Sequence, residues 1–118
     1  MKKFWKFTFV CSCRGNRSWF VHECTMFNEN NIELASSKCQ YYNRTREPRT
    51  YYTAIRDCVR TYRNERIERA ITNWKIENWK NRLPNWKRDE LTKEFDNSEL
   101  GKELRTALDE TESYHSCR

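Results

Sequence analysis

The chain has 118 residues, of which 36% are hydrophobic and 34% charged, and its formal net charge is +6. This length predicts one domain with a small core, and no run of about 18 apolar residues is present to span a membrane. The sequence contains no H-E-x-x-H motif, no G-x-S-x-G motif and no Gly-rich phosphate loop, so we expect a non-enzymatic protein without a cofactor.

Alternating hydrophobic and polar residues predict β-strands in the first 42 residues. Phe7, Phe9 and Cys11 would share one face of the first strand. Turn-forming segments that contain Gly and Asn separate the extended segments. The expected strands and turns, in chain order, are Phe4–Ser12, Arg14–Arg17, Ser18–Phe27, Asn28–Asn31 and Ile32–Tyr42.

The next segment, from Tyr51 to Lys80, has two hydrophobic stripes at helical spacing. The stripe that contains Ile55 and Val59 is rotated by roughly a quarter turn from the stripe that contains Ile67 and Ile71. One straight helix would then have no single buried side. We therefore predict a break near Asn64, which is a favourable N-cap residue. The expected elements are a strand at Tyr51–Cys58 and a helix at Glu65–Arg82, ended by Pro84.

After Pro84 the pattern is again helical. Leu100, Leu104 and Leu108 form a stripe at four-residue spacing, and Ser98 is placed to cap that helix. The expected fold class is α+β, with a three-stranded antiparallel sheet in the N-terminal half packed by a helix. Residues 1–83 would form this cysteine-containing domain, and residues 84–118 an acidic helical extension.

Six cysteines are present, and their chemistry has three interpretations. An even number fits disulfides in an oxidising compartment. A zinc site would use Cys11, Cys13, Cys39 and Cys58 with His22 in reserve, but no C-x2-C pair is present, so we assign no metal ligands. The third interpretation is reduced, buried thiols in an intracellular protein. The candidate disulfide cysteines are Cys11, Cys13, Cys24, Cys39, Cys58 and Cys117.

The spacing Cys11-x-Cys13, 25 residues, Cys39, 18 residues, Cys58 resembles that of the CXC chemokines. The resemblance implies three antiparallel strands, at Ile32–Ala35, Gln40–Arg44 and Tyr51–Cys58, with a C-terminal helix across the sheet. It implies disulfides that join Cys11 to Cys39 and Cys13 to Cys58, which leaves Cys24 and Cys117 as an extra pair. It also implies a secreted signalling protein that binds a receptor or an acidic polysaccharide.

A second likeness is to zinc-binding modules of the zygote-arrest and receptor-transporting type. It is carried by Phe9-Val10-Cys11-Ser12-Cys13, Ser18-Trp19 and Lys38-Cys39-Gln40. This likeness favours the alternative function, an intracellular basic module that binds nucleic acid or belongs to a larger complex.

The charge distribution predicts a surface for a polyanion. Residues 44–88 contain 13 Lys and Arg against five Asp and Glu, whereas residues 89–118 contain four against nine. A basic middle fits acidic polysaccharide, nucleic acid or an acidic protein surface, and the Trp–Lys mixture around Trp79 favours nucleic acid. A solvated helix neutralised by the acidic tail is the alternative. The candidate polyanion-binding residues are Arg44, Arg46, Arg49, Arg56, Arg60, Arg63, Lys75, Lys80 and Arg82.

Overall fold

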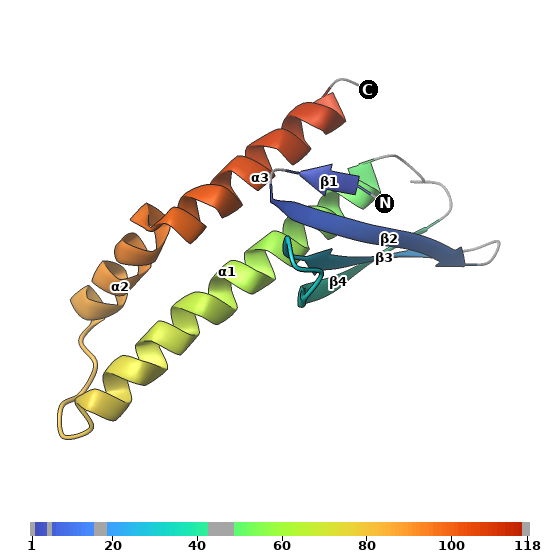
Figure 1. Ribbon diagram of the computed structural model, residues 1–118. Coiled ribbons are helices and arrows are strands. Elements are labelled where there is room, and N and C mark those ends of the chain that lie inside the picture. Colours follow the sequence, from blue (N-terminus) through green and yellow to red (C-terminus); the bar gives the residue numbers. More distant parts are fainter. Residues whose placement is uncertain (1, 5, 16–18, 43–48, 117–118) are drawn as a thin grey trace.

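The computed structural model describes the backbone of residues 2–4, 6–15, 19–42 and 49–116, and the side chains of residues 6–12, 15, 21–38 and 53–110. A β-sheet formed by the N-terminal part of the chain packs on helices formed by the C-terminal part (Figure 1). The elements are β1 (Lys2–Phe4), β2 (Phe7–Gly15), β3 (Trp19–Phe27), β4 (Glu33–Tyr42), α1 (Arg49–Glu77), α2 (Asn85–Asn97) and α3 (Glu99–Ser116).

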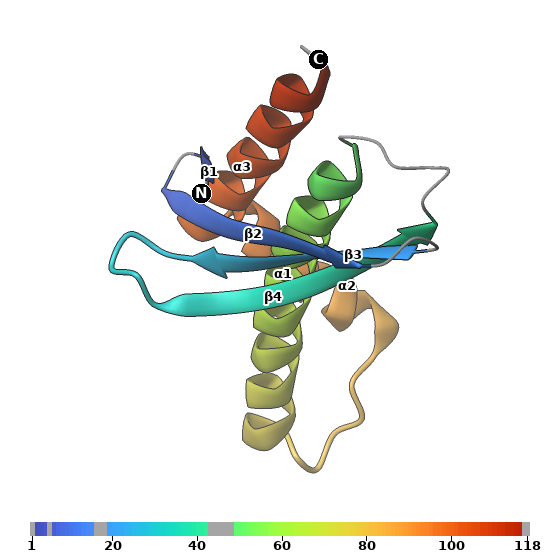
Figure 2. The same ribbon diagram turned by 90° about the vertical axis from the view of Figure 1, so that its right-hand side faces the viewer.

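The four strands form an antiparallel sheet in the order β1-β2-β3-β4. The hydrophobic alternation in β2 correctly predicted which residues face the core. Phe7 and Phe9 are buried on the inner face of the sheet, whereas Val10, the next residue of β2, is exposed. Asn28 organises the turn between β3 and β4, since its Oδ1 accepts hydrogen bonds from the backbone N–H groups of Asn30 and Ile32. Figure 2 shows the strands crossing α1 at a steep angle.

The predicted α+β class, with an antiparallel sheet before the helices, is confirmed. The short strand β1 adds a fourth strand to the predicted three. The two strands that the chemokine resemblance implied at Ile32–Ala35 and Gln40–Arg44 are wrong, because Glu33–Tyr42 is one continuous strand.

The predicted strand at Tyr51–Cys58 and the predicted break near Asn64 are also wrong. Helix α1 runs without interruption from Arg49 to Glu77. Ile55 and Val59 in its first half belong to the core cluster between the sheet and α3. Its second half, which buries Ile67 and Ile71, lies along α2 in Figure 1. Two hydrophobic stripes therefore belong to one helix because that helix has two partners on different sides.

Helices α2 and α3 form a second layer along α1. The predicted leucine stripe is confirmed, since Leu104 is buried in the core and both Leu100 and Leu108 pack against it. The predicted cap is confirmed as well, because Ser98 Oγ accepts a hydrogen bond of 3.1 Å from the backbone N–H of Gly101. Helix α2 buries none of its residues.

The disulfide joins Cys11 to Cys24 across β2 and β3. The pairing that the chemokine resemblance implied is wrong, because it assigned Cys11 to Cys39 and Cys13 to Cys58. The register of the β2–β3 hairpin determines the pairing, since it sets Cys11 directly opposite Cys24 with a Cα–Cα distance of 4.3 Å. In the same register His22 lies between Cys13 and Cys39, so these two cysteines are separated by a whole strand. The side chains of Cys13, Cys39 and Cys117 lie outside the described part of the chain.

Cys58 is a free thiol on α1, fully buried under the sheet. Its Sγ donates a hydrogen bond of 3.1 Å to the backbone carbonyl of Cys24. Burial, with a smaller contribution from the charge of Asp57, raises the pKa of Cys58 to about 12. A thiol in this state stays protonated and packs as a small hydrophobic side chain.

Within residues 2–4, 6–15, 19–42 and 49–116, no helix has the length and apolar character needed to cross a bilayer.

Candidate anion-binding groove

A groove rich in positive charge lies between α1 and α3. It has a volume of about 660 Å³, and Asp96 and Asn97 at the end of α2 also line it. Helix α1 contributes Arg60 and Arg63, which lie three residues apart and so share one side of the helix. Helix α3 contributes Lys102 and Arg105 at the same spacing. Two pairs of cationic side chains therefore face one space from opposite walls.

Arg63 and Asp96 form the best-defined contact of the groove. Arg63 donates from Nε to Oδ1 at 2.9 Å and from Nη2 to Oδ2 at 2.8 Å, which is the paired geometry of a guanidinium and a carboxylate. This hydrogen bonding, helped by the charges of Arg63 and Arg105, holds the pKa of Asp96 below its usual range. It also raises the pKa of Arg63. The contact fixes the Arg63 side chain against the last turn of α2.

The groove keeps a large excess of positive charge after this pairing. Its lining contains four cationic side chains and one carboxylate, Asp96. Arg60, Lys102 and Arg105 are exposed and make no ion pair with any residue that the structure describes. Three donors therefore remain available to a ligand that carries sulfate, phosphate or carboxylate groups.

The floor of the groove depends on a close approach at Gly101. A Cβ atom at this position would lie 2.9 Å from the Cα of Asp96 and would also strike the carbonyl oxygen of Phe95. Glycine lets the backbone of the last turn of α2 lie directly on α3, with Leu104 buried one turn further along. Asp96 reaches Arg63 because of this contact.

The predicted polyanion-binding residues do not form one patch. Arg60 and Arg63 line the groove, whereas Lys75, Lys80 and Arg82 are exposed near the distant end of α1. Fifteen residues of helix separate Arg60 from Lys75, which corresponds to roughly 22 Å. The remaining predicted residues differ from both groups: Arg56 is half-buried on α1 and does not line the groove, the Arg49 side chain is not described, and Arg44 and Arg46 lie outside the described residues.

Sequence reasoning missed Lys102 and Arg105. Residues 89–118 carry a net negative charge, and this average concealed a local pair of cations on one side of α3. The spacing of Lys102 and Arg105 matches that of Arg60 and Arg63, and this shared spacing was the available signal.

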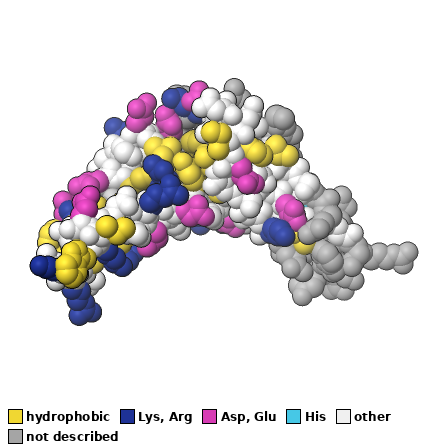
Figure 3. All heavy atoms as spheres, turned by 60° about the horizontal axis from the view of Figure 1, so that its bottom comes forward, with side chains coloured by type: hydrophobic (Ala, Val, Ile, Leu, Met, Phe, Trp, Pro, Cys, Tyr) yellow, Lys and Arg dark blue, Asp and Glu magenta, His cyan; other side chains and the backbone are white. Residues whose placement is uncertain are grey.

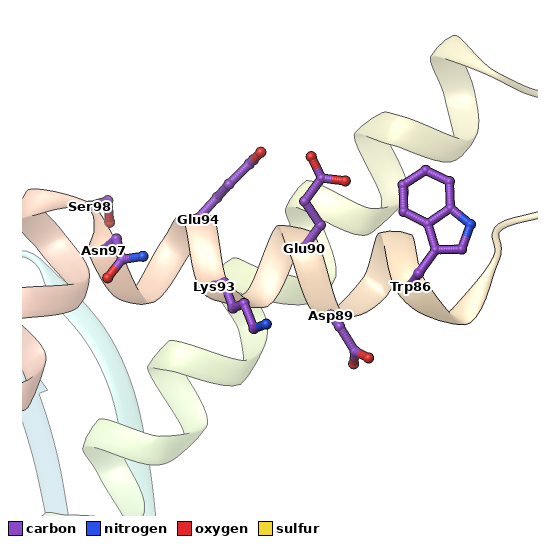
Figure 4. Close-up of a pocket in the computed structure, with 7 residues that line it drawn as sticks. All are labelled: Trp86, Asp89, Glu90, Lys93, Glu94, Asn97 and Ser98. Carbon is purple, nitrogen blue, oxygen red and sulfur yellow. The ribbon is translucent and has the colours of Figure 1, made fainter.

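A second depression, on the outer face of α2, has the opposite charge. It has a volume of about 630 Å³ and is lined by Asp89, Glu90 and Glu94 with a single cation, Lys93. Figure 4 shows Glu90, Glu94 and Trp86 pointing to one side of α2, with Lys93 and Asp89 on the other. Glu90 is partly neutralised by Lys87 at 3.5 Å. The two depressions therefore differ in the charge of the ligand that they favour.

The described side chains offer no candidate metal site. They contain no group of three or more His, Cys, Asp or Glu residues that converges on one point.

Comparison with family models, with curated proteins and with solved structures found no match to this chain.

Proposed function

We propose that this protein is a non-enzymatic binding protein whose α1–α3 groove binds an acidic polysaccharide. The observation that carries the proposal is the convergence of four cationic side chains on one groove that contains a single carboxylate. Such a site attracts a chain of sulfate or carboxylate groups, and its affinity falls as salt screens the charges.

The lining of the groove favours a polysaccharide over nucleic acid. Its described residues include leucine and threonine but no aromatic side chain. Proteins that bind single-stranded nucleic acid without sequence preference stack the bases on aromatic rings, which this groove does not offer. A ligand recognised through its charges alone fits better.

The disulfide supports an extracellular location for this binding activity. A disulfide between Cys11 and Cys24 is typical of a protein from an oxidising compartment. We therefore propose that the protein acts outside the cell, where sulfated polysaccharides are available as ligands.

The test compares two triple variants that lose the same charge. The groove variant carries Arg60→Gln, Lys102→Gln and Arg105→Gln. The control variant carries Lys38→Gln, Arg69→Gln and Lys93→Gln, at exposed positions that do not line the groove. Binding of a fluorescent heparin oligosaccharide is measured by anisotropy at two salt concentrations.

Each lost contact is worth about 0.5–1 kcal/mol, so the groove variant should bind about ten- to a hundredfold more weakly than the parent. The control variant should change affinity by less than about threefold. An equal loss in both variants would assign the binding to net charge and refute the groove. Tighter binding of a single-stranded oligonucleotide than of heparin at the same salt concentration would favour the nucleic-acid alternative.

A further inference from the structure

The end of the molecule opposite the sheet exposes three large hydrophobic side chains. Ile76, Trp79 and Trp86 are 67%, 76% and 66% exposed. They lie in the last turn of α1, in the connection to α2 and in the first turn of α2. We call this end the tip, and define it by Lys75, Ile76, Trp79, Lys80, Arg82 and Trp86. Figure 1 shows that it is the extremity of the helical layer, and Figure 3 shows hydrophobic and cationic side chains side by side at this end.

The hydrophobic residues of the tip are accompanied by positive charge. Lys75, Lys80 and Arg82 are exposed, and none of them forms an ion pair within the described part of the chain. Glu77 is the one acidic residue between Lys75 and Trp86 in the sequence, and the acidic depression that Trp86 also lines runs from there along α2, away from the tip. A partner of the tip must therefore supply an apolar environment and negative charge together.

We propose that the tip docks on the surface of an anionic lipid bilayer. Tryptophan is favoured at the level of the lipid headgroups, where its ring is buried and its N–H stays hydrated. Lysine and arginine beside it are attracted to the negative surface potential of anionic lipids. Both requirements of the tip are met at one interface.

Three observations favour a bilayer over single-stranded nucleic acid. Lys80 Nζ lies 5.2 Å from the centre of the Trp79 ring, so a cation already occupies a face on which a base would stack. Ile76 offers no flat ring to a base, whereas the acyl region of a lipid would bury it. The tip is also a projecting end rather than a groove that could follow a nucleic-acid backbone.

The shape of the molecule sets the geometry of this docking. The protein measures 55 × 28 × 25 Å, and the tip lies at one end of its longest dimension. Contact through the tip would hold the sheet away from the lipid and leave the α1–α3 groove open to solvent. Docking and groove binding are therefore independent activities.

The experiment uses the full chain and vesicles of phosphatidylcholine, either pure or with about one-third phosphatidylserine. The apolar variant carries Trp79→Ser and Trp86→Ser, and the charge variant carries Lys75→Gln, Lys80→Gln and Arg82→Gln. The apolar control carries Val10→Ala on β2 and Ile32→Ala in the turn before β4. All these side chains are exposed, so circular dichroism should match the parent. Binding is measured by co-sedimentation.

The parent should bind the phosphatidylserine vesicles at least tenfold more tightly than the pure phosphatidylcholine vesicles. The apolar variant should lose at least tenfold in affinity, the charge variant should lose the preference for phosphatidylserine, and the apolar control should bind as the parent does. The groove variant with changes at Arg60, Lys102 and Arg105 should retain vesicle binding, which separates this proposal from the proposed function. Absence of vesicle binding by the parent would overturn the proposal. Vesicle binding that is unchanged in the apolar variant would also overturn it. The same holds if the parent binds an oligonucleotide instead of vesicles and loses that binding when both tryptophans are replaced.

Discussion

Replacing Gly101 with alanine tests the packing that builds the groove. In an ordinary helical position this change would stabilise the protein by about 1 kcal/mol, because alanine has the higher helix propensity. Here the added Cβ would lie 2.9 Å from the Cα of Asp96 and 3.0 Å from its carbonyl carbon. The obstructing atoms belong to the backbone of the last turn of α2, so relief requires that turn or the first turn of α3 to unwind.

The expected result is a net loss of stability. Overpacking of this kind costs about 1–3 kcal/mol, and loss of the Ser98 cap would add about 1 kcal/mol. After the gain in propensity, Gly101→Ala should be less stable than the parent by about 1–3 kcal/mol. Displacement of the last turn of α2 should also move Asp96 away from Arg63, so affinity for the groove ligand should change together with stability.

Urea unfolding followed by circular dichroism measures this difference, and Asn73→Ala is the matched control. Asn73 is exposed on α1, so the control should gain about 0.5 kcal/mol from propensity alone. If Gly101→Ala were stabilised as much as Asn73→Ala, the close approach of the last turn of α2 to Gly101 would be disproved. Thermal unfolding gives a second readout, with a midpoint lowered by several degrees, at about 4–8 °C per kcal/mol for a domain of this approximate size.

Three further predictions concern stability. Because the pKa of Cys58 is raised to about 12 in the folded protein, the unfolded state releases the proton first, so stability falls as pH rises above 9. Between pH 8 and pH 10 the parent should lose about 1.4 kcal/mol more than Cys58→Ala in urea unfolding, and parallel curves would contradict the burial of the neutral thiol. Ser98→Ala should lose about 1 kcal/mol in thermal unfolding while Ser98→Asp keeps most of the stability, and equal losses would show that the cap is unimportant. Reduction of Cys11–Cys24 should lower the free energy of unfolding of the parent by about 2–3 kcal/mol and should leave that of a variant with alanine at both positions unchanged. An identical response of the two proteins to reductant would contradict this prediction.

The sheet was predictable from the sequence because its signal is local. Phe7, Phe9 and Cys11 alternate with polar residues, and this alternation alone assigns one face of β2 to the core. The leucine stripe of α3 was predictable for the same reason. Both patterns arise from the contact of one element with one partner.

The continuity of α1 was not predictable because its pattern reflects two partners. A stripe through Ile55 and Val59 meets the sheet, and a stripe through Ile67 and Ile71 meets the layer of α2. In the sequence, two rotated hydrophobic stripes in one helix cannot be distinguished from the stripes of two separate elements. A disulfide was predicted, but its pairing was wrong for a related reason, since Cys11 and Cys24 become neighbours through the register of a hairpin, and spacing along the chain does not determine register.

Half of the candidate groove was predictable. The basic stretch that contains Arg60 and Arg63 was evident in the sequence, but the wall formed by Lys102 and Arg105 was not. Those two cations belong to an acidic segment, and only the packing of α3 along α1 brings them opposite the arginines. A site shared between segments of opposite net charge cannot be found from the charge of each segment.

The absence of buried residues in α2 has a consequence for motion. Beyond Ile71, the described part of α1 buries no further side chain, so the outer portion of the helical layer is held by little apolar contact. The core that contains Phe9, Met26 and Leu104 lies toward the sheet. Backbone amides near the tip should therefore exchange with solvent through local unfolding that leaves the sheet intact, and proteases should cut there first. The free energy of opening should rise along the length of the molecule, from the tip to the sheet.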